Sequence, residues 1–261
     1  MKIFSHSLQG KRESNEDKHV HIINLDGCNK NYNAINFFAV FDGHGGKAVS
    51  KYLKKVLPPL FVNKFDKDMY SNAAIVSRYI KRVFDRIQKS LNDDHPKLAQ
   101  YCGSTACIVI HYKDILWVAN IGDSRTIKCN KSNIAEQLTQ DHKPNNPDER
   151  VRIENLGGKI KFDGVDWRIN DLSLSRAFGD IDCTPYVTHV PQIYKYKVLP
   201  TDKFIILACD GLWDVISNQD AIDFIISLMI CKTKCNYAKE LAEHAYKKGS
   251  LDNITVIVNV L

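Results

Sequence analysis

Apolar residues occur along this chain in short runs interrupted by polar or turn-forming residues, a pattern typical of a protein with many strands. Runs rich in Val, Ile and Phe predict strands, because β-branched and aromatic side chains suit a pleated surface. The predicted strands are residues 18–24, 35–41, 105–111, 115–121, 125–129, 204–209 and 254–261. Apolar residues at helical spacing predict helices over residues 45–57, 72–92, 147–156, 218–230 and 236–247.

Short connections between successive strands indicate antiparallel pairing. The segment HYKDIL joins two strands, GDS joins the next two, and NKSN follows. A parallel crossover needs roughly a dozen residues or more, which these links do not supply. We therefore expect two antiparallel sheets packed together with long helices outside them, and not a doubly wound nucleotide-binding fold.

Length and composition favour one compact domain over residues 1–261. The chain is 44% hydrophobic and 25% charged, with neither a Pro/Gly/Ser-rich linker nor an internal repeat. The N-terminus turns polar after four residues, so it lacks the apolar core of a signal peptide. The longest apolar runs are too short to cross a bilayer, so we expect no membrane association. Eight scattered cysteines suit reduced thiols, which predicts a cytoplasmic location without excluding the nucleus.

The net charge of +6 is concentrated partly on the predicted helix over residues 72–92. This helix has an apolar face and a basic face, and the latter has two interpretations. It can be an ordinary solvated surface, or it can dock an acidic partner or a nucleic acid. Without basic residues interleaved with aromatic ones, we do not expect nucleic acid to be the partner. The basic residues are Arg78, Lys81, Arg82, Arg86 and Lys89.

Acidic residues stand directly before or after several predicted strands. In antiparallel order the start of one strand lies beside the end of its neighbour, so both kinds of acid can gather along one rim of the sheets. Three follow strands, and a glycine comes next after two of these. The acids after strands are Asp42, Asp123 and Asp210, and those before strands are Glu16, Asp17 and Asp252.

Carboxylates gathered in this way would repel one another strongly unless positive charge lay among them. The segments around Asp42, Asp210 and Asp252 contain almost no Lys or Arg, so divalent cations are the simpler solution. Oxygen ligands without Cys or clustered His favour Mg²⁺ or Mn²⁺ over zinc. Asp42 could bridge two ions, and Gly43 would let its carbonyl approach one of them. The alternative for any single Asp-Gly is an ordinary turn.

Nine segments, in order and nearly end to end, carry a resemblance to a known family. The chain resembles the metal-dependent protein phosphatases of the protein phosphatase 2C type, which are serine/threonine-specific enzymes. The resemblance implies an α+β fold, a four-layer α-β-β-α sandwich with two central antiparallel sheets flanked by helices. The segments are SLQGKRESNED (7–17), FFAVFDGHGG (37–46), GSTA (103–106), VANIGDSR (118–125), LTQDHKP (138–144), ERVRIENLGG (149–158), LSLSRAFGD (172–180), ILACDGLWDV (206–215) and GSLDNITVIVNV (249–260).

The resemblance also implies two Mg²⁺ or Mn²⁺ ions per chain and a weaker third. Asp42 would bridge the two ions, and the Gly43 carbonyl would join one of them. The other ligands would be Asp210 and Asp252 directly, Asp123 at the third ion, and Glu16, Asp17 and Thr105 through water.

The implied reaction is hydrolysis of phosphoserine and phosphothreonine by a water that two cations activate, without a phospho-enzyme intermediate. Arg12 resembles the family's phosphate-binding arginine, whose fork can grip two oxygens; the alternative is a partner for Glu16 or Asp17. His44 resembles the proposed general acid for the leaving oxygen; the alternative is a histidine that holds the turn. We interpret His142 as structural.

Phosphorylated proteins would be the substrates, and we expect a monomer. The chain departs from the family between Arg168 and Ser175, where it is one residue shorter, and Asp171 stands where a glycine is common. Substrate preference therefore stays open. Two other functions remain as alternatives: a catalytically inactive relative that acts as a binding module, and a two-metal nuclease recruited by the basic helices.

Overall fold

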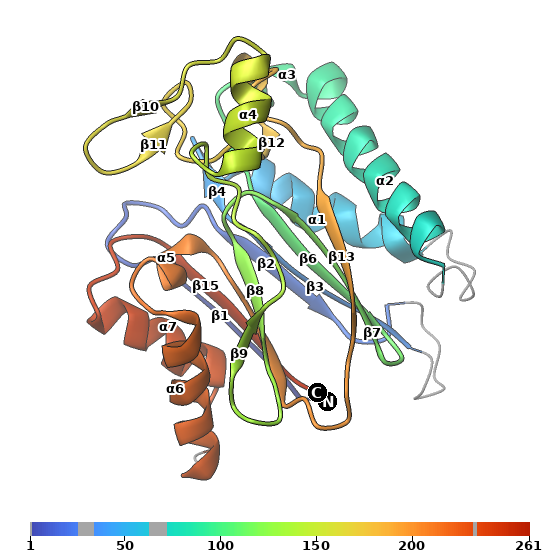
Figure 1. Cartoon of the computed structure of the whole chain (residues 1–261), viewed down its shortest axis with the longest axis vertical. Helices are drawn as coiled ribbons and strands as arrows, with labels where there is room; N and C mark the ends of the chain where they lie inside the picture. The colour runs from blue at the N-terminus through green and yellow to red at the C-terminus, as the bar shows by residue number, and fades with distance from the viewer. Residues whose placement is uncertain (1, 26–33, 63–71, 232–233) are drawn as a thin grey trace.

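The computed structural model describes residues 2–25, 34–62, 72–231 and 234–261. Two five-stranded antiparallel sheets lie at the centre, and helices cover the outer face of each (Figure 1). The fold is the four-layer α-β-β-α sandwich that the resemblance implied. Helices α1 (Ala48–Val62) and α2 (Ala73–Asp94) cover one sheet, and α6 (Asn218–Ile230) and α7 (Tyr237–Lys247) cover the other.

The first sheet, beneath α1 and α2, has the strand order β13-β7-β6-β3-β2. Every neighbouring pair in it is antiparallel. Its strands are β2 (Lys18–Ile22), β3 (Ile35–Phe41), β6 (Ala106–Tyr112), β7 (Ile115–Ile121) and β13 (Gln192–Lys197).

The second sheet has the strand order β1-β15-β14-β8-β9 and is also antiparallel throughout. Chain ends far apart in sequence meet here, because β1 pairs along its length with β15. Its strands are β1 (Lys2–Leu8), β8 (Arg125–Cys129), β9 (Ala135–Gln137), β14 (Phe204–Ala208) and β15 (Ile254–Val260).

Smaller elements gather at one end of the sandwich (Figure 1). A three-stranded sheet has the order β12-β5-β4, and β10 pairs with β11 in a hairpin. We call residues 157–187, which include this hairpin, the flap. The elements are β4 (Gly43–His44), α3 (Pro96–Ala99), β5 (Gly103–Ser104), α4 (Pro147–Asn155), β10 (Lys161–Phe162), β11 (Trp167–Arg168), β12 (Phe178–Gly179), the 3₁₀ helix η2 (Ile181–Cys183) and α5 (Asp210–Trp213).

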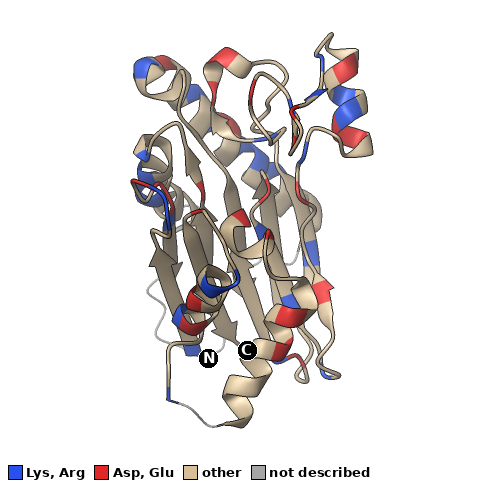
Figure 2. Ribbon diagram, turned by 90° about the vertical axis from the view of Figure 1, so that its left-hand side faces the viewer, with Lys and Arg blue, Asp and Glu red and all other residues tan. Residues whose placement is uncertain are grey.

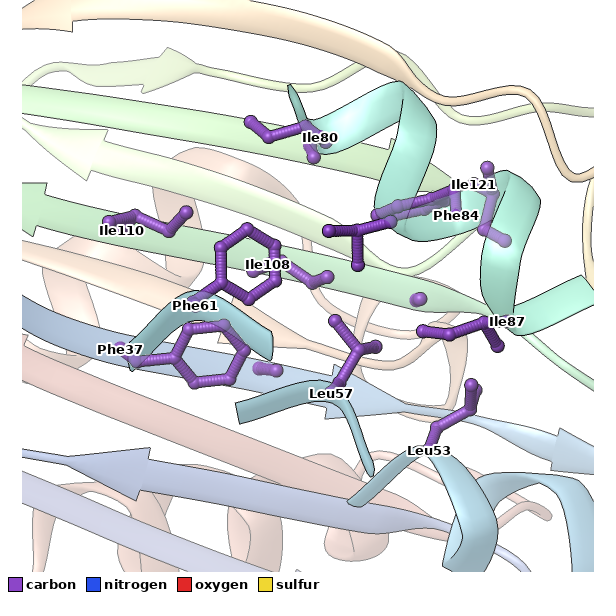
Figure 3. Packing of buried hydrophobic residues seen from close by; sticks show 14 of the residues in the cluster. Phe37, Leu53, Leu57, Phe61, Ile80, Phe84, Ile87, Ile108, Ile110 and Ile121 are labelled. Atoms are coloured by element: carbon purple, nitrogen blue, oxygen red, sulfur yellow. The ribbon is translucent and has the colours of Figure 1, made fainter. Parts of the chain in front are cut away.

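Alternate side chains of β3 serve two different interfaces. Phe37 and Phe41 pack with the apolar faces of α1 and α2, as Figure 3 shows for Phe37 beside Leu57 and Phe61. Phe38 and Val40 point the other way, into the interface between the two sheets. Because both faces of the strand are buried, its sequence INFFAVF is almost uninterrupted in apolar residues.

The flap is attached to the body through Glu149, which is buried in α4. Ser175 Oγ donates to this carboxylate over 2.7 Å and Arg176 Nε over 2.9 Å. Burial alone would raise the pKa of Glu149, but the hydrogen bonds and charge of Arg176 outweigh it and lower the pKa to about 2. The attachment is therefore ionic at neutral pH.

Most charged residues lie outside this core. In the view of Figure 2 the strands are almost entirely tan, and most blue and red positions fall in helices and loops. The basic side of α2 is exposed, including Arg78, Lys81 and Arg82. Lys89 pairs with Asp93 over 2.5 Å on the same helix. This face is solvated in the structure, and a partner for it stays a prediction.

The predicted strands and helices are all present, with two corrections. Helix α1 begins at Ala48 and continues to Val62, although residues 45–57 were expected. It passes through Pro58 and Pro59, because Leu57 and Phe61 are buried on its core face and the packing outweighs the lost hydrogen bonds.

The second correction concerns the link GDS. Strands β7 and β8 do not pair, although their short connection predicted it; they belong to different sheets. Three residues are enough to cross from one sheet to the other where the sheets come together at their ends. The crossing places Asp123 between the two sheets.

Replacement of Phe84 in α2 tests the packing between the helices and the first sheet. Its side chain is fully buried, and its ring lies 4.9 Å from that of Phe178 in β12. We expect Phe84→Ala to lower the free energy of unfolding by about 3–5 kcal/mol, because it leaves a cavity. Ile75→Ala, at a position 42% exposed on the same helix, is the control and should change it by less than about 0.5 kcal/mol. Urea unfolding measures both, and equal effects would contradict this packing.

Candidate active site

The register of the first sheet brings Asp17 and Asp42 together. Lys18, the first residue of β2, pairs with Phe41, the last residue of β3. Asp17 and Asp42 directly adjoin this pair, so they lie at the same end of the sheet. The gathering of acids from strand starts and strand ends, predicted from antiparallel order, is confirmed here.

The second sheet contributes the remaining acids at the same end. Ala208 closes β14 and pairs with Val256, near the start of β15. Asp210 follows β14 as the first residue of α5, and Asp252 precedes β15. The GDS crossing adds Asp123 from between the sheets.

A cleft of about 530 Å³ opens where these strand ends meet. It is lined by most of the residues that the sequence singled out. Asp17 and Thr105 are buried and do not line it. The predicted residues in its walls are Arg12, Glu16, Asp42, Gly43, His44, Asp123, Asp210 and Asp252.

Asp42 lies at the centre of the acidic cluster. Carboxylate oxygens of Asp42, Asp123 and Asp210 lie within 4.8 Å of one another. A second group within the same distance joins Asp42 to Asp17 and to the Cys209 thiol. Among the described residues Asp42 alone belongs to both groups, so its carboxylate lies where it could contact cations on two sides.

The inner acids are held in an unfavourable electrostatic environment. Removal from water, and then the charges of Asp17 and Asp210, raise the pKa of Asp42 well above its ordinary value. Burial and Asp123 similarly raise the pKa of Asp210. Burial raises the pKa of Asp17 to about 6, although neighbouring hydrogen bonds lower it in part. Divalent cations would reverse these shifts.

Two other acids of the cleft, Asp252 and Asp123, are paired with protein cations. Arg12 Nη2 lies 2.6 Å from Asp252 Oδ2, at the exposed edge of the cleft. Lys143 Nζ forms an ion pair with Asp123, which lies deeper. Burial would lower the pKa of Lys143, but Asp123 and Asp210 raise it above the ordinary range. Among the described residues, Asp17, Asp42 and Asp210 form no such ion pair, and Asp17 Oδ2 is buried without a hydrogen-bond partner.

Glu16 and Thr105 hold the backbone around Asp42. Glu16 Oε2 accepts a hydrogen bond of 2.9 Å from the Gly46 N–H. Thr105 Oγ1 accepts one of 3.1 Å from the Asp42 N–H and pairs with Ser124 Oγ over 2.7 Å. Both residues therefore fix the loop that carries Asp42, in addition to any contact with water.

Two glycines beside the acids are required by close packing. A Cβ on Gly43 would lie 2.6 Å from the Glu16 carbonyl oxygen. One on Gly211, next to Asp210, would collide with the Asn253 carbonyl. The Asp-Gly pairs at both strand ends thus let loops of neighbouring strands touch, which brings their acids together.

His44 forms a pair with Asp180, a residue that sequence reasoning did not single out. His44 Nε2 lies 2.7 Å from Asp180 Oδ2. Burial would lower the pKa of His44, but the hydrogen bond and charge of Asp180 outweigh it and raise the pKa. A Cβ on Gly103 would collide with both side chains, so this glycine leaves the space that the pair occupies.

Three residues of the site escaped the sequence analysis. Lys143 and Asp180 stand in the segments LTQDHKP and LSLSRAFGD, but nothing in the spacing links Asp180 to His44 or Lys143 to Asp123. Cys209 lies behind Asp17; burial raises the pKa of its thiol well above the ordinary value, so it stays protonated. His142 is buried, and its Nδ1 accepts a hydrogen bond of 3.1 Å from the Gly122 N–H, which supports a structural role.

The donor set fits Mg²⁺ or Mn²⁺. The clustered atoms facing the cleft are carboxylate oxygens, and the thiol beside them is protonated, so hard divalent cations match better than zinc. The unpartnered Asp17 oxygen and the crowded Asp42 would both gain from added positive charge.

Comparison with known proteins agrees with this geometry. The sequence model of the family Protein phosphatase 2C matches residues 1–254. "Probable protein phosphatase 2C 59" of Arabidopsis thaliana is 40% identical over 257 residues, which cover 97% of this chain and 77% of the relative. "Probable protein phosphatase 2C 7" of Oryza sativa subsp. japonica is 37% identical over 256 residues, 97% of this chain but only 63% of that protein.

A solved structure shares the fold. The serine-threonine phosphatase 2C from Toxoplasma gondii superposes with a TM-score of 0.85 at 24% identity, covering 99% of this chain and 95% of the other. The family model over residues 1–254 and the 40% identical relative show that the chain belongs to the protein phosphatase 2C family. No helix in the described parts of the chain has the length and apolar character to span a membrane.

Replacement of Asp42 by Asn tests the repulsion among the inner acids. Without divalent cations we expect Asp42→Asn to unfold at a temperature about 2–6 °C above that of the unchanged protein, because it removes one charge from the cluster. Thermal unfolding in a chelator, followed by circular dichroism, measures this. Asp114→Asn, on the exposed turn after β6, is the control and should leave the temperature unchanged. A less stable Asp42→Asn would contradict the repulsion.

Proposed function

We propose that this chain is a Mg²⁺- or Mn²⁺-dependent protein phosphatase that hydrolyses phosphoserine and phosphothreonine in proteins. The observation that carries the proposal is the position of Asp42, shared by two groups of ligand atoms at the floor of a cleft that also contains Arg12 and His44. Membership in the protein phosphatase 2C family supports the same conclusion.

Two cations would be held around Asp42, with the Gly43 carbonyl at one of them. Asp210 and Asp252 would complete the direct ligands, and Asp123 would hold a weaker third ion together with Asp210. Glu16, Asp17 and Thr105 would act through water. When bound, such cations supply a water of lowered pKa as the nucleophile and neutralise charge on the phosphoryl group.

Arg12 would bind the substrate phosphate at the edge of the cleft. Its side chain is 61% exposed, so it is free to turn from Asp252 towards an arriving dianion. Its planar guanidinium can donate to two phosphate oxygens at once. Asp252, released from Arg12, would then be available to a cation.

His44 would protonate the leaving serine or threonine oxygen. Nε2–H donates to the Asp180 carboxylate, which leaves Nδ1 to carry the proton for the substrate. The raised pKa of His44 favours its charged form. Asp180 is thus a positioning residue that orients the ring and stabilises its charged form.

The alternative functions receive less support. An inactive binding module would have no need for the unpaired acids of the inner cluster. A nuclease recruited by its basic helices would need those helices near the cleft. No residue of α2 lines the cleft. A monomeric state and a cytoplasmic or nuclear location stay predictions.

The first experiment measures hydrolysis of a phosphothreonine peptide with Mn²⁺ and then with excess chelator. We expect turnover that needs the metal, and Asp210→Asn should lower kcat/KM roughly 100-fold or more, because the loss of a ligand charge removes several kcal/mol of stabilisation. The control is again Asp114→Asn, which should keep full activity. Turnover that resists the chelator, or cleavage of labelled DNA or RNA in place of the peptide, would contradict the proposal.

The second experiment tests Asp180. Asp180→Asn should lower kcat on a phosphothreonine peptide roughly 10–100-fold with little change in KM, because a poorly oriented His44 protonates the alkoxide less well. p-Nitrophenyl phosphate, whose leaving group needs no proton, should be affected much less. The control is Asp182→Asn, at an exposed neighbouring carboxylate. Equal losses on the two substrates would show that Asp180 serves the structure of the site in general.

A further inference from the structure

A second cleft adjoins the one that holds the acids. It has a volume of about 340 Å³ and lies between the end of α4 and the flap hairpin. Arg168 of β11 lines both clefts, so the two share a wall. A peptide bound with its phosphorylated residue in the first cleft therefore has a neighbouring hollow within reach. We call this second hollow the flap cleft.

The walls of the flap cleft are held in place by packing and hydrogen bonds. A Cβ on Gly158 would lie 2.6 Å from Ile153 Cγ2 and 2.8 Å from Tyr186 Cδ1, so the chain leaving α4 packs tightly on both. Asp163 Oδ1 accepts hydrogen bonds of 2.8 Å from the Val165 and Asp166 N–H groups and fixes the hairpin turn. The cleft is thus built into the flap.

The charge of the flap cleft is positive. Lys159 and Lys161 line it, both are exposed, and neither forms an ion pair or a side-chain hydrogen bond within the described residues. Arg168 is already paired with Asp163, and its Nη1 donates to the Asp171 carbonyl over 2.8 Å. Asp171 is the one acid among the described residues that line the cleft. The two lysines therefore supply the charge that has no partner.

We infer that the flap cleft binds an anionic group of the substrate chain, a carboxylate or a second phosphate, and so directs the enzyme to phosphoproteins with acidic sequences around the phosphorylated residue. The inference rests on the proposed phosphatase function. Because the two clefts share Arg168, we expect the anionic residue to lie within a few positions of the phosphorylated one in an extended peptide. Lysines at the rim of a cleft act mainly on binding, so the preference for anionic peptides should appear as a lower KM.

The test compares three phosphothreonine peptides with the same backbone. One carries Glu at the flanking positions, one carries a phosphoserine there, and one carries Gln. We expect the protein to hydrolyse the Glu or phosphoserine peptide with a kcat/KM about 5–20-fold higher than the Gln peptide. The advantage should fade in ~1 M salt, because exposed charges are screened. Which anionic peptide is preferred distinguishes a carboxylate from a second phosphate.

Two variants assign the effect to the flap cleft. Lys159→Gln combined with Lys161→Gln should remove the preference for anionic peptides. The kcat/KM on the Gln peptide should stay within about twofold of that of the unchanged protein. Lys159→Glu with Lys161→Glu should reverse it towards a peptide with flanking lysines. The matched control is Lys97→Gln with Lys131→Gln, two exposed lysines elsewhere, which changes net charge equally and should keep the preference.

Each outcome separates this inference from the proposed function. Hydrolysis of all three peptides at one rate, or a preference that survives both lysine variants, would overturn the flap cleft while leaving the phosphatase intact. If the lysine variants lowered kcat/KM equally on the Gln and Glu peptides, the inference would also be overturned, because the lysines would then act on the whole site. Failure to hydrolyse any phosphopeptide with Mn²⁺ would overturn both.

Discussion

Asp17, Asp42 and Asp210 cannot all be ionised in the poorly hydrated space that they share unless positive charge is brought to them. These acids come from both sheets, so the sandwich can close only if its apolar contacts outweigh their repulsion. Phe38, Val109 and Leu207 belong to the buried layer between the sheets that supplies this stabilisation. The apolar core therefore opposes the repulsion within the acidic cluster, and the divalent cations that we propose would relieve that repulsion.

Ion pairs surround the cluster of Asp17, Asp42 and Asp210. Arg12 meets Asp252 at the open edge, and Lys143 meets Asp123 deeper in the cleft. Each pair leaves a carboxylate neutralised by a protein cation, which an incoming divalent cation or phosphate would have to displace. The separate pair of His44 and Asp180 holds a proton beside the same centre. An ion that displaced one partner of such a pair would neutralise the charge of the remaining partner.

Local sequence predicted the central strands of both sheets and one edge strand, β2, but missed the edge strands β1, β9 and β13. Strands β3 and β7 have the predicted bounds, because nearly continuous apolar runs identify them, and β8 has the predicted bounds although its sequence RTIKC is mixed. Strands β1 (KIFSHSL) and β13 (QIYKYK) were not predicted, because polar residues interrupt their apolar positions. In the site, antiparallel order predicted the gathering of the acids. It could not predict that Lys143 meets Asp123 or that Asp180 meets His44, because those pairs depend on how the flap and the loops fold back over the strand ends.

Anomalous X-ray diffraction from crystals grown with Mn²⁺ tests the central claim most directly, since it locates the cations independently of activity. The account predicts two manganese peaks about 3.5–4 Å apart at the floor of the cleft, with a carboxylate oxygen of Asp42 between them. Diffraction that shows no manganese in the cleft, or a single peak remote from Asp42, would contradict it.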